Sequence, residues 1–349
     1  MISAARRQSP VGRTRIRISG VLCVAFVCAL PVQAQGIWET FSNDYPSNCL
    51  AWTRDNSNPV IAPSGSTWKS RWTADPDLFR LADRLLLYYR GTGIVPGKGK
   101  VYHDRIGVAE IQTIGAMQLS FRDLNNGSPV IDIGAEGTFD EQDVLEPAAV
   151  WFKEKVYLYY TGMGKGKTGI GLATSANGEH FLKVGKVLDG CAPDVIVLHD
   201  TLYMFYQKPE SSGYSIHLAI SVDGQKFFAL GSRPVLGGVP GHWDAKSLTT
   251  PRVWSSGEWF YMMYGGSADA VDDPEYFGLA RSHDLLRWER HPGNPIFAAG
   301  AHATADGGTI RFPAIYDAGS WFVLLYEGSR GKHAWDLSSG ICIAWIPKR

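Results

Sequence analysis

Residues 145–175 read LEPAAVWFKEKVYLYYTGMGKGKTGIGLATS, and this stretch contains three short apolar runs separated by turn residues. Each run is rich in β-branched and aromatic residues and is bounded by residues such as Gly, Pro and Ser, which is typical of β-strands. The first run contains a proline, the second closes on aromatic residues and a turn, and the third reads IGLATS. The pattern predicts three successive β-strands.

The same order of runs occurs five times, and a repeat of this kind constrains the fold more than any single residue does. The proline-containing run recurs as ADPDLFR from Ala74, LEPAAVWF from Leu145, CAPDVIVL from Cys191, TTPRVW from Thr249 and RFPAIY from Arg311. The aromatic run follows a few residues later, as LLLYYRG from Leu85, VYLYYTG from Val156, LYMFYQ from Leu202, WFYMMYGG from Trp259 and WFVLLYEG from Trp321.

Two further signals complete each repeat. The third run recurs as IGVAEI from Ile106, IGLATS from Ile170, IHLAIS from Ile216, FGLARS from Phe277 and ICIAWI from Ile341. A polar turn and strand then end in NPVI from Asn58, SPVI from Ser128, GKVL from Gly185, RPVL from Arg233 and NPIF from Asn294. Four strands in each of five repeats predict an all-β fold, a five-bladed β-propeller with four-stranded blades.

The positions of the repeats at the two ends of the chain predict how the ring closes. The NPVI copy at Asn58 precedes the first proline-containing run, and the last copy in the chain is the third run at Ile341. The last blade therefore lacks an outer strand, which residues 50–61 are expected to supply, removing an open sheet edge. A β-sandwich with coincidental spacing is the alternative, and five ordered copies favour the propeller.

The N-terminal 34 residues have the pattern of a signal peptide. A basic stretch with five arginines precedes the apolar run VLCVAFVCAL at residues 21–30, and Val32-Gln33-Ala34 fits a cleavage site. The apolar run is shorter than the ~20 residues that a membrane-spanning helix needs. We expect residues 1–34 to be a signal peptide, residues 35–349 to form one propeller domain, and the protein to be secreted or periplasmic.

The composition narrows the range of partners. With 34 Lys and Arg against 34 Asp and Glu, the formal net charge is zero, which disfavours nucleic-acid binding. No later apolar run is long enough to span a membrane, and Cys49, Cys191 and Cys342 have no metal-ligand spacing. We expect a monomer without a cofactor, although a carboxylate-rich axis could hold a structural Ca²⁺.

The proline-containing strands place charged residues on the predicted axis. Side chains alternate faces along a strand, so the residues before and after each proline are expected to share a face. These pairs are Asp75/Asp77, Glu146/Ala148, Ala192/Asp194, Thr250/Arg252 and Phe312/Ala314. Because the innermost strands of a propeller line its channel, four carboxylates and one arginine should converge there. Such clusters of like charge are usually functional.

Other residues are candidates for binding a ligand at the mouth of the channel. Arg90 and Glu327 end the second strands of their repeats, and His242 lies in the loop before the fourth proline-containing strand. Trp68 and Trp243 occupy equivalent loops. Their rings are either sugar-stacking platforms or anchors that pack the loops, and the sequence leaves both readings open.

The first repeat (ADPDLFR), the YY-x-G and IGLATS units and the stretch GTFDEQDVLEP resemble the five-bladed propeller glycosidases, from Trp52 to the C-terminus. These are the arabinanase and xylosidase group (glycoside hydrolase family 43) and the levansucrase and invertase group (family 32). The resemblance implies a glycoside hydrolase acting on an oligo- or polysaccharide. LLLYYRG followed by IGVAE is also similar to the mannoside phosphorylases of family 130.

The resemblance carries over to individual residues. In those families an Asp before Pro in the first blade is the base or nucleophile, which implies this role for Asp75, and a second acidic residue before Pro resembles Glu146. The third acidic motif of family 32 is missing at Cys191-Ala192-Pro193, where Asp194 is the remaining acidic residue.

Glycosidic cleavage needs one carboxylic acid and one carboxylate, and a third charge nearby can keep the pKa of the acid high. We expect Asp75 to be the base or nucleophile, Glu146 the acid and Asp194 the modulator, with Asp77 and Arg252 binding sugar hydroxyls. An exchange of Glu146 and Asp194 stays open. The alternatives are a non-catalytic carbohydrate-binding propeller, a glycoside phosphorylase and a scaffold for protein partners.

Overall fold

The structure is a computed structural model that describes residues 36–41, 50–65, 68–98, 102–115, 117–211, 213–269, 273–333 and 339–348. The described residues all belong to one unit of the chain, Gln33–Arg349. The predicted signal peptide (residues 1–34) and Cys49 lie outside them. Within the described ranges, no helix has the length and apolar character needed to cross a membrane.

Three sheets have four strands each, and the first three predicted runs of the corresponding repeats lie within these strands. The first is β2 (Trp72–Leu81), β3 (Arg84–Ile94), β4 (Tyr102–Gly115) and β5 (Gln118–Asp123). The second is β6 (Asp143–Phe152), β7 (Lys155–Gly164), β8 (Lys167–Ser175) and β9 (Leu182–Leu188). The third pairs β19 (Thr309–Asp317), β20 (Trp321–Ser329), β21 (Ser339–Pro347) and β1 (Thr53–Arg54).

The remaining sheet has nine strands and consists of two antiparallel runs. One run is β10 (Cys191–Leu198), β11 (Thr201–Glu210), β12 (Gly213–Ser221) and β13 (Phe228–Ala229). The other is β14 (Ser247–Ser256), β15 (Trp259–Ser267), β16 (Tyr276–Ser282), β17 (Glu289–Arg290) and β18 (Phe297–Ala298). A single parallel pair, Tyr214 with Ser247, joins the two runs. Each run therefore repeats the strand order of the four-stranded sheets.

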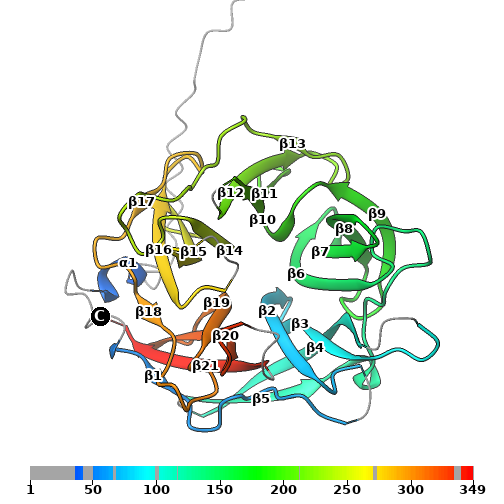
Figure 1. The fold of residues 1–349 in the computed structure, drawn as a ribbon, viewed down its shortest axis with the longest axis horizontal. Helices are drawn as coiled ribbons and strands as arrows, with labels where there is room; N and C mark the ends of the chain where they lie inside the picture. The colour runs from blue at the N-terminus through cyan, green and yellow to red at the C-terminus, as the bar shows by residue number, and fades with distance from the viewer. Residues whose placement is uncertain are drawn as a thin grey trace, which may run out of the picture. The chain divides into compact units, whose positions relative to one another are not determined.

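The five proline-containing strands contact one another in a ring. β2 contacts β6, β6 contacts β10, β10 contacts β14, β14 contacts β19, and β19 contacts β2. Figure 1 shows these strands innermost, with β5, β9, β13, β17 and β1 towards the outside. The arrangement brings residues that are far apart in the sequence to a common centre.

The N-terminal strand completes the sheet that contains the C-terminal strand, as the sequence predicted for residues 50–61. Thr53 and Arg54 of β1 pair antiparallel with Trp345 and Ala344 of β21, and Ile61 bridges to Ile341. Helix is confined to short segments of the described chain, such as α1 (Ile37–Thr40) and the 3₁₀ turn η2 (Asn125–Gly127).

Apolar side chains fill the space between adjacent sheets. Between the first and second sheets, for example, Leu86, Val108, Val144 and Leu158 are buried in one cluster. Burial of each such side chain contributes roughly 1.5–3 kcal/mol relative to exposure. The core therefore lies between the sheets and leaves the polar residues of the innermost strands to the centre.

A polar trio recurs where a loop meets its sheet. A buried loop aspartate accepts a hydrogen bond from a tyrosine of the second strand and pairs with a cation of the outer strand. The trios are Asp140 with Tyr160 and Lys183, Asp244 with Tyr264 and Arg290, and Asp306 with Tyr326 and Arg54. In the first sheet the positions of the two charges are reversed. The cation, Lys69, lies in the loop, and the aspartate, Asp123, lies on the outer strand β5.

Candidate active site

Each innermost strand is interrupted at its proline by a bulge. The residue before the proline has a positive φ in all five strands: Asp75 (50°), Glu146 (57°), Ala192 (45°), Thr250 (48°) and Phe312 (51°). Non-glycine residues rarely adopt this region, and the strand register shifts across each proline. The expected alternation therefore does not hold here, and the residues before and after a proline belong to different clusters.

Before the prolines, Asp75 and Glu146 lie together. The backbone N–H of Glu146 donates a hydrogen bond to Asp75 Oδ2 at 3.1 Å, and Glu146 Oε2 in turn accepts one from the N–H of Ala192 at 2.7 Å. Arg90 Nε is 3.0 Å from Asp75 Oδ2. The Asp75 and Glu146 carboxyl groups are both buried, so two of the predicted catalytic residues form one buried cluster. We call the side chains around them the Asp75 cluster.

Glu327, predicted as a residue of the channel mouth, forms a hydrogen bond with the Asp75 carboxyl group. Its Oε1 is 3.3 Å from Arg90 Nη2, and its Oε2 is 3.8 Å from Arg311 Nε. A hydrogen bond between two carboxyl groups requires a proton on one of them. Glu327 therefore belongs to the Asp75 cluster, together with Arg90 and Arg311.

The surroundings favour Asp75 as the carboxyl group that carries this proton. Burial raises the pKa of Asp75 well above its ordinary value; Arg90 opposes this shift, while Glu327 and Glu146 add to it. Burial also acts to raise the pKa of Glu327, but Arg311 and Arg90 outweigh it, and the pKa is lowered. The opposite directions of the two pKa shifts thus favour the shared proton on Asp75 rather than on Glu327.

After the prolines, a second cluster contains Asp77, Asp194 and Arg252. Asp77 Oδ2 accepts a hydrogen bond from the N–H of Ala149 at 2.8 Å, and Asp194 Oδ2 accepts one from that of Val253 at 2.6 Å. Arg252 lies between them, with Nε 3.7 Å from Asp77 Oδ1 and Nη1 3.8 Å from Asp194 Oδ1. The structure thus groups Asp194 with Asp77 and Arg252 rather than with Asp75 and Glu146.

Arg252 holds the innermost strands together through their backbones. Its Nη1 donates to the carbonyl oxygens of Pro193 and Pro251 at 3.2 and 3.3 Å, and its Nη2 to those of Pro76 and Pro147, both at 3.3 Å. The guanidinium therefore links four of the five strands of the ring. These bonds occupy Nη1 and Nη2 of Arg252, a residue that we expected to bind sugar hydroxyls.

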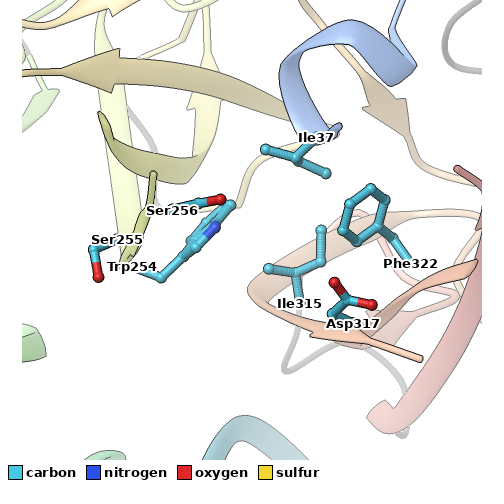
Figure 2. Close-up of a pocket in the computed structure, with 7 residues that line it drawn as sticks. All are labelled: Ile37, Trp254, Ser255, Ser256, Ile315, Asp317 and Phe322. Carbon is cyan, nitrogen blue, oxygen red and sulfur yellow. The ribbon is translucent and has the colours of Figure 1, made fainter. Parts of the chain in front are cut away.

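Two cavities adjoin the Arg252 cluster. One of about 120 Å³ is lined by Asp77, Asp194 and Arg252 together with apolar residues of β2, β14 and β19. A second, of about 260 Å³, lies between β14 and β19 and shares Trp254 and Ile315 with the first. Figure 2 shows Trp254, Ile315 and Phe322 around it, with Ile37 of α1 nearby. Neither cavity is lined by Asp75 or Glu146.

The remaining predicted residues have different surroundings. Trp68 is buried, its Nε1 donates to the carbonyl oxygen of Gly127 at 2.7 Å, and its ring lies where a Cβ on Gly91 would be, at 2.3 Å. These are the contacts of a loop anchor. Trp243 also packs on a glycine, Gly266, but lines a cavity of about 170 Å³ as well. His242 is exposed in its loop.

Sequence reasoning missed two members of the Asp75 cluster. Asp104 of β4 is 3.6 Å from Arg90 Nη1, and Arg311 of β19 pairs with Glu327. The signal for Asp104 is the charged pair Asp104-Arg105 directly before the apolar run of the third strand. Among the described side chains, no group of three or more His, Cys, Asp or Glu residues could hold a metal ion.

Comparisons with known proteins show which solved structures have a similar fold. No protein-family model matches the chain, and a search of the curated proteins found no match. Among solved structures, a glycosyl hydrolase from Bacteroides ovatus has 15% sequence identity, covers 87% of this chain and 96% of its own, and gives a TM-score of 0.67.

Two further solved structures agree with this fold. A β-1,2-mannobiose phosphorylase from Listeria innocua in complex with β-1,2-mannobiose has 13% identity, covers 85% of this chain and 96% of its own, and has a TM-score of 0.65. A structure described with glycoside hydrolases of the GH130 family that target β-1,2 mannosidic linkages has 15% identity, 84% and 93% coverage, and a TM-score of 0.62. The chain thus has the β-propeller-like fold of these glycosidase structures.

Proposed function

We propose that this protein is an exported glycoside hydrolase built as a five-bladed β-propeller. Five strands contact one another in a ring, and the nine-stranded sheet divides into two runs at a single parallel pair, which supports five blades. The observation that carries the function is the buried Asp75 cluster, in which Asp75, Glu146 and Glu327 meet from three different sheets. Hydrolysis of a glycosidic bond needs two carboxyl groups in different protonation states.

The environment of each carboxyl group suggests its role. Asp75, which holds a proton through burial and the neighbouring Glu327, is suited to protonate the leaving oxygen as general acid. Glu146 is then the base that takes a proton from water, or the nucleophile at the anomeric carbon. This exchanges the roles that the sequence analysis gave to Asp75 and Glu146.

In the reaction, the Asp75 proton passes to the glycosidic oxygen as the bond between that oxygen and the anomeric carbon breaks. In an inverting reaction, water attacks the same carbon while Glu146 accepts its proton, and the sugar is released with inverted configuration. In a retaining reaction, Glu146 forms a covalent intermediate, and water hydrolyses it with Asp75 as the base. The configuration of the released sugar distinguishes the two.

The charges around Asp75 favour water over phosphate as the acceptor. Arg90 is ion-paired with the carboxylates of Asp104 and Glu327 and lies 3.0 Å from the carboxyl group of Asp75. Arg311 is paired with two, those of Glu327 and Asp273. A phosphate dianion would compete with these carboxylates for the same guanidinium groups and would be repelled by them. Hydrolysis is therefore the favoured reaction, and phosphorolysis is one outcome of the test.

The experiment is a screen of the purified protein against arabinofuranosides, xylosides, fructans, galactosides and mannosides, with and without inorganic phosphate. We expect release of a free sugar in both buffers, with its anomer recorded by NMR. Asp75→Asn should lower kcat/KM by at least about 100-fold. Phosphate-dependent release of a sugar phosphate would show a phosphorylase, and binding of a glycan without release would show a carbohydrate-binding protein.

Asp194→Asn tests the alternative assignment of the modulator. It removes a carboxyl group of the same kind from the other side of the prolines, so we expect it to lower kcat/KM less than about tenfold. A loss as large as that of Asp75→Asn would restore Asp194 to the catalytic site. Asp200→Asn, in the exposed turn between β10 and β11, is the neutral control.

The proposal also includes export, the domain organisation and the oligomeric state. Residues 1–34 are proposed as a cleaved signal peptide and residues 35–349 as a single, monomeric domain. Expression of the full chain in a bacterium, followed by fractionation, N-terminal sequencing and light scattering, tests this. A protein that keeps residue 1 and stays with the cytoplasmic fraction would contradict it.

A further inference from the structure

A cavity of about 170 Å³ lies beside the ends of β15 and β20 and the start of β16. We call it the rim cavity. Its lining includes two aromatic rings and three carboxylates, from Trp243, Tyr276, Asp269, Asp273 and Glu275. The lining also includes Gly266 and the pair Lys332 and His333. The cavity is therefore polar and aromatic together, unlike the apolar spaces between the sheets.

A continuous series of ion pairs joins the rim cavity to the Asp75 cluster. Asp273, a lining residue, has Oδ1 3.6 Å from Arg311 Nη2. Arg311 Nε is 3.8 Å from Glu327 Oε2, and Glu327 forms a hydrogen bond with Asp75. Asp273, Arg311 and Glu327 thus form a chain of contacts from the lining of the rim cavity to the carboxyl group of Asp75.

Two rings form a corner of the cavity. The Trp243 and Tyr276 ring centroids are 6.0 Å apart with an interplanar angle of 69°. Trp243 is held in place by stacking on Tyr264 at 5.8 Å and by Gly266, where a Cβ would lie 2.2 Å from the indole. A fixed, amphipathic aromatic surface of this kind binds a flat apolar face while polar groups nearby take hydrogen bonds.

The charges of the cavity favour an uncharged ligand over an anionic one. Asp273 is paired with Arg311 and with His333, whose Nδ1 is 2.7 Å from Asp273 Oδ2. Asp269 and Glu275 are exposed, and no described residue forms an ion pair or side-chain hydrogen bond with their carboxylates. With Lys332 as the remaining cation, the lining carries more negative than positive charge. Carboxylates accept hydrogen bonds from sugar hydroxyls and repel other carboxylates.

We propose that the rim cavity is a binding subsite for one uncharged sugar unit of the substrate, next to the bond that is cleaved. The place of this unit in the substrate rests on the proposed function, whereas sugar binding by the cavity does not. Trp243 and Tyr276 contact a face of the sugar ring. Asp269 and Glu275 accept hydrogen bonds from its hydroxyls and exclude uronic acids.

The test uses the full chain carrying Asp75→Asn, so that binding is measured without turnover. The probes are methyl glucoside, methyl galactoside and methyl mannoside, each with its matching methyl uronoside, and the readout is saturation-transfer NMR titration. We expect at least one neutral glycoside to bind at least tenfold more tightly than its uronoside. Equal binding of the two members of every pair, or no binding of any neutral probe, would overturn the proposal.

Two variants locate the binding in the rim cavity. In the Asp75→Asn chain, Asp269→Asn with Glu275→Gln should reduce the preference for the neutral member to less than about threefold, since both repelling charges are lost. Tyr276→Ala should weaken binding of the neutral probe about fivefold. Glu258→Gln, in the exposed turn between β14 and β15, is the control and should change neither.

The outcomes separate this proposal from the proposed function. Sugar binding that responds to the rim variants, in a protein whose wild type releases no product, would leave the subsite standing and contradict hydrolysis. Turnover that needs Asp75, together with probe binding that is unchanged in the Tyr276→Ala and Asp269→Asn/Glu275→Gln chains, would contradict the subsite and leave hydrolysis standing.

Discussion

In the ring of innermost strands, similar charged residues lie before and after the prolines but have different roles on the two sides. Before the prolines, Asp75 and Glu327 hydrogen-bond to each other, and arginines reach them from neighbouring strands. After the prolines, Asp77 and Asp194 flank Arg252, whose terminal nitrogens donate to four backbone carbonyls. A charged residue near the axis is therefore not by itself evidence of a catalytic site. On one side two carboxyl groups share a proton, and on the other an arginine holds the strands together through their backbone carbonyls.

The largest effect that separates the two sides is expected at Arg252. Arg252→Met removes the hydrogen bonds to four strands and leaves Asp77 and Asp194 buried without a cation. Removal of one partner from a buried ion pair costs about 3–5 kcal/mol. We expect a loss of this size in the free energy of unfolding, measured by urea denaturation at pH 7.5.

Two comparisons test the reason for this loss. Arg252→Lys keeps the charge but has no planar fork for four carbonyls, so it should fall between wild type and Arg252→Met. The triple variant with Asp77→Asn and Asp194→Asn removes the unpaired charges and should recover part of the loss. If the free energy of unfolding of Arg252→Met is within about 1 kcal/mol of the wild-type value, Arg252 does not hold the four strands together.

The next effect concerns the pH dependence of stability on the Arg252 side. Burial raises the pKa of Asp77 from its ordinary value of 3.8 to about 7; Arg252 opposes the shift, and Asp194 adds to it. Between these values the folded chain holds a proton that the unfolded chain has lost. Stability therefore falls as the pH rises through this window, by on the order of 2 kcal/mol between pH 5 and 8.

Asp77→Asn should remove this contribution, because asparagine does not titrate. The free energy of unfolding of wild type and variant, measured by urea denaturation at several pH values, should differ in slope between pH 5 and 8 and run parallel above it. Parallel curves across the whole range would mean that Asp77 has no raised pKa in the folded chain.

The smallest effect is expected on the Asp75 side, at Glu327. The negative charge of Glu327 helps to keep the proton on Asp75, so Glu327→Gln should lower the pKa of Asp75. If Asp75 is the general acid, the alkaline limb of kcat/KM moves to lower pH, by about one unit or 1.4 kcal/mol. The measurement is a pH–rate profile of folded variant, with Glu258→Gln as the control.

An unchanged alkaline limb in Glu327→Gln, with activity otherwise retained, would remove Glu327 from the acid's environment. A limb that moves to higher pH would contradict the sign of the interaction. Glu327→Gln and Arg252→Met together test whether catalysis depends on the residues before the prolines and the stability of the ring on those after them.

Much of the fold could be predicted because its strands repeat. The runs VYLYYTG and IGLATS lie within β7 and β8, and the expected outer strand at residues 50–61 contains β1. Strand signals are local, since they depend on β-branched and aromatic residues between turns. Five copies in the same order reinforced a pattern that a single copy would have left ambiguous.

The site was less predictable because it depends on backbone geometry at the prolines. The alternation of side chains placed Asp75 and Asp77 on one face, but the bulge at Pro76 and the positive φ of Asp75 separate them. Contacts between sheets, such as that of Glu327 with Asp75, also have no local signal. Trp68 and Trp243, in equivalent loops, differ in whether the ring also lines a cavity, which the surrounding loops decide.

The pairing of β1 with β21 has a consequence for how the chain acquires its structure during synthesis. Thr53 and Trp345 are partners across one ladder, although nearly all of the described chain lies between them. Arg54 likewise meets Asp306 only after the first four repeats and the loop before β19 have been translated. The ring therefore cannot close on the ribosome before β21 has been translated, and until then β1 has no partner from β21.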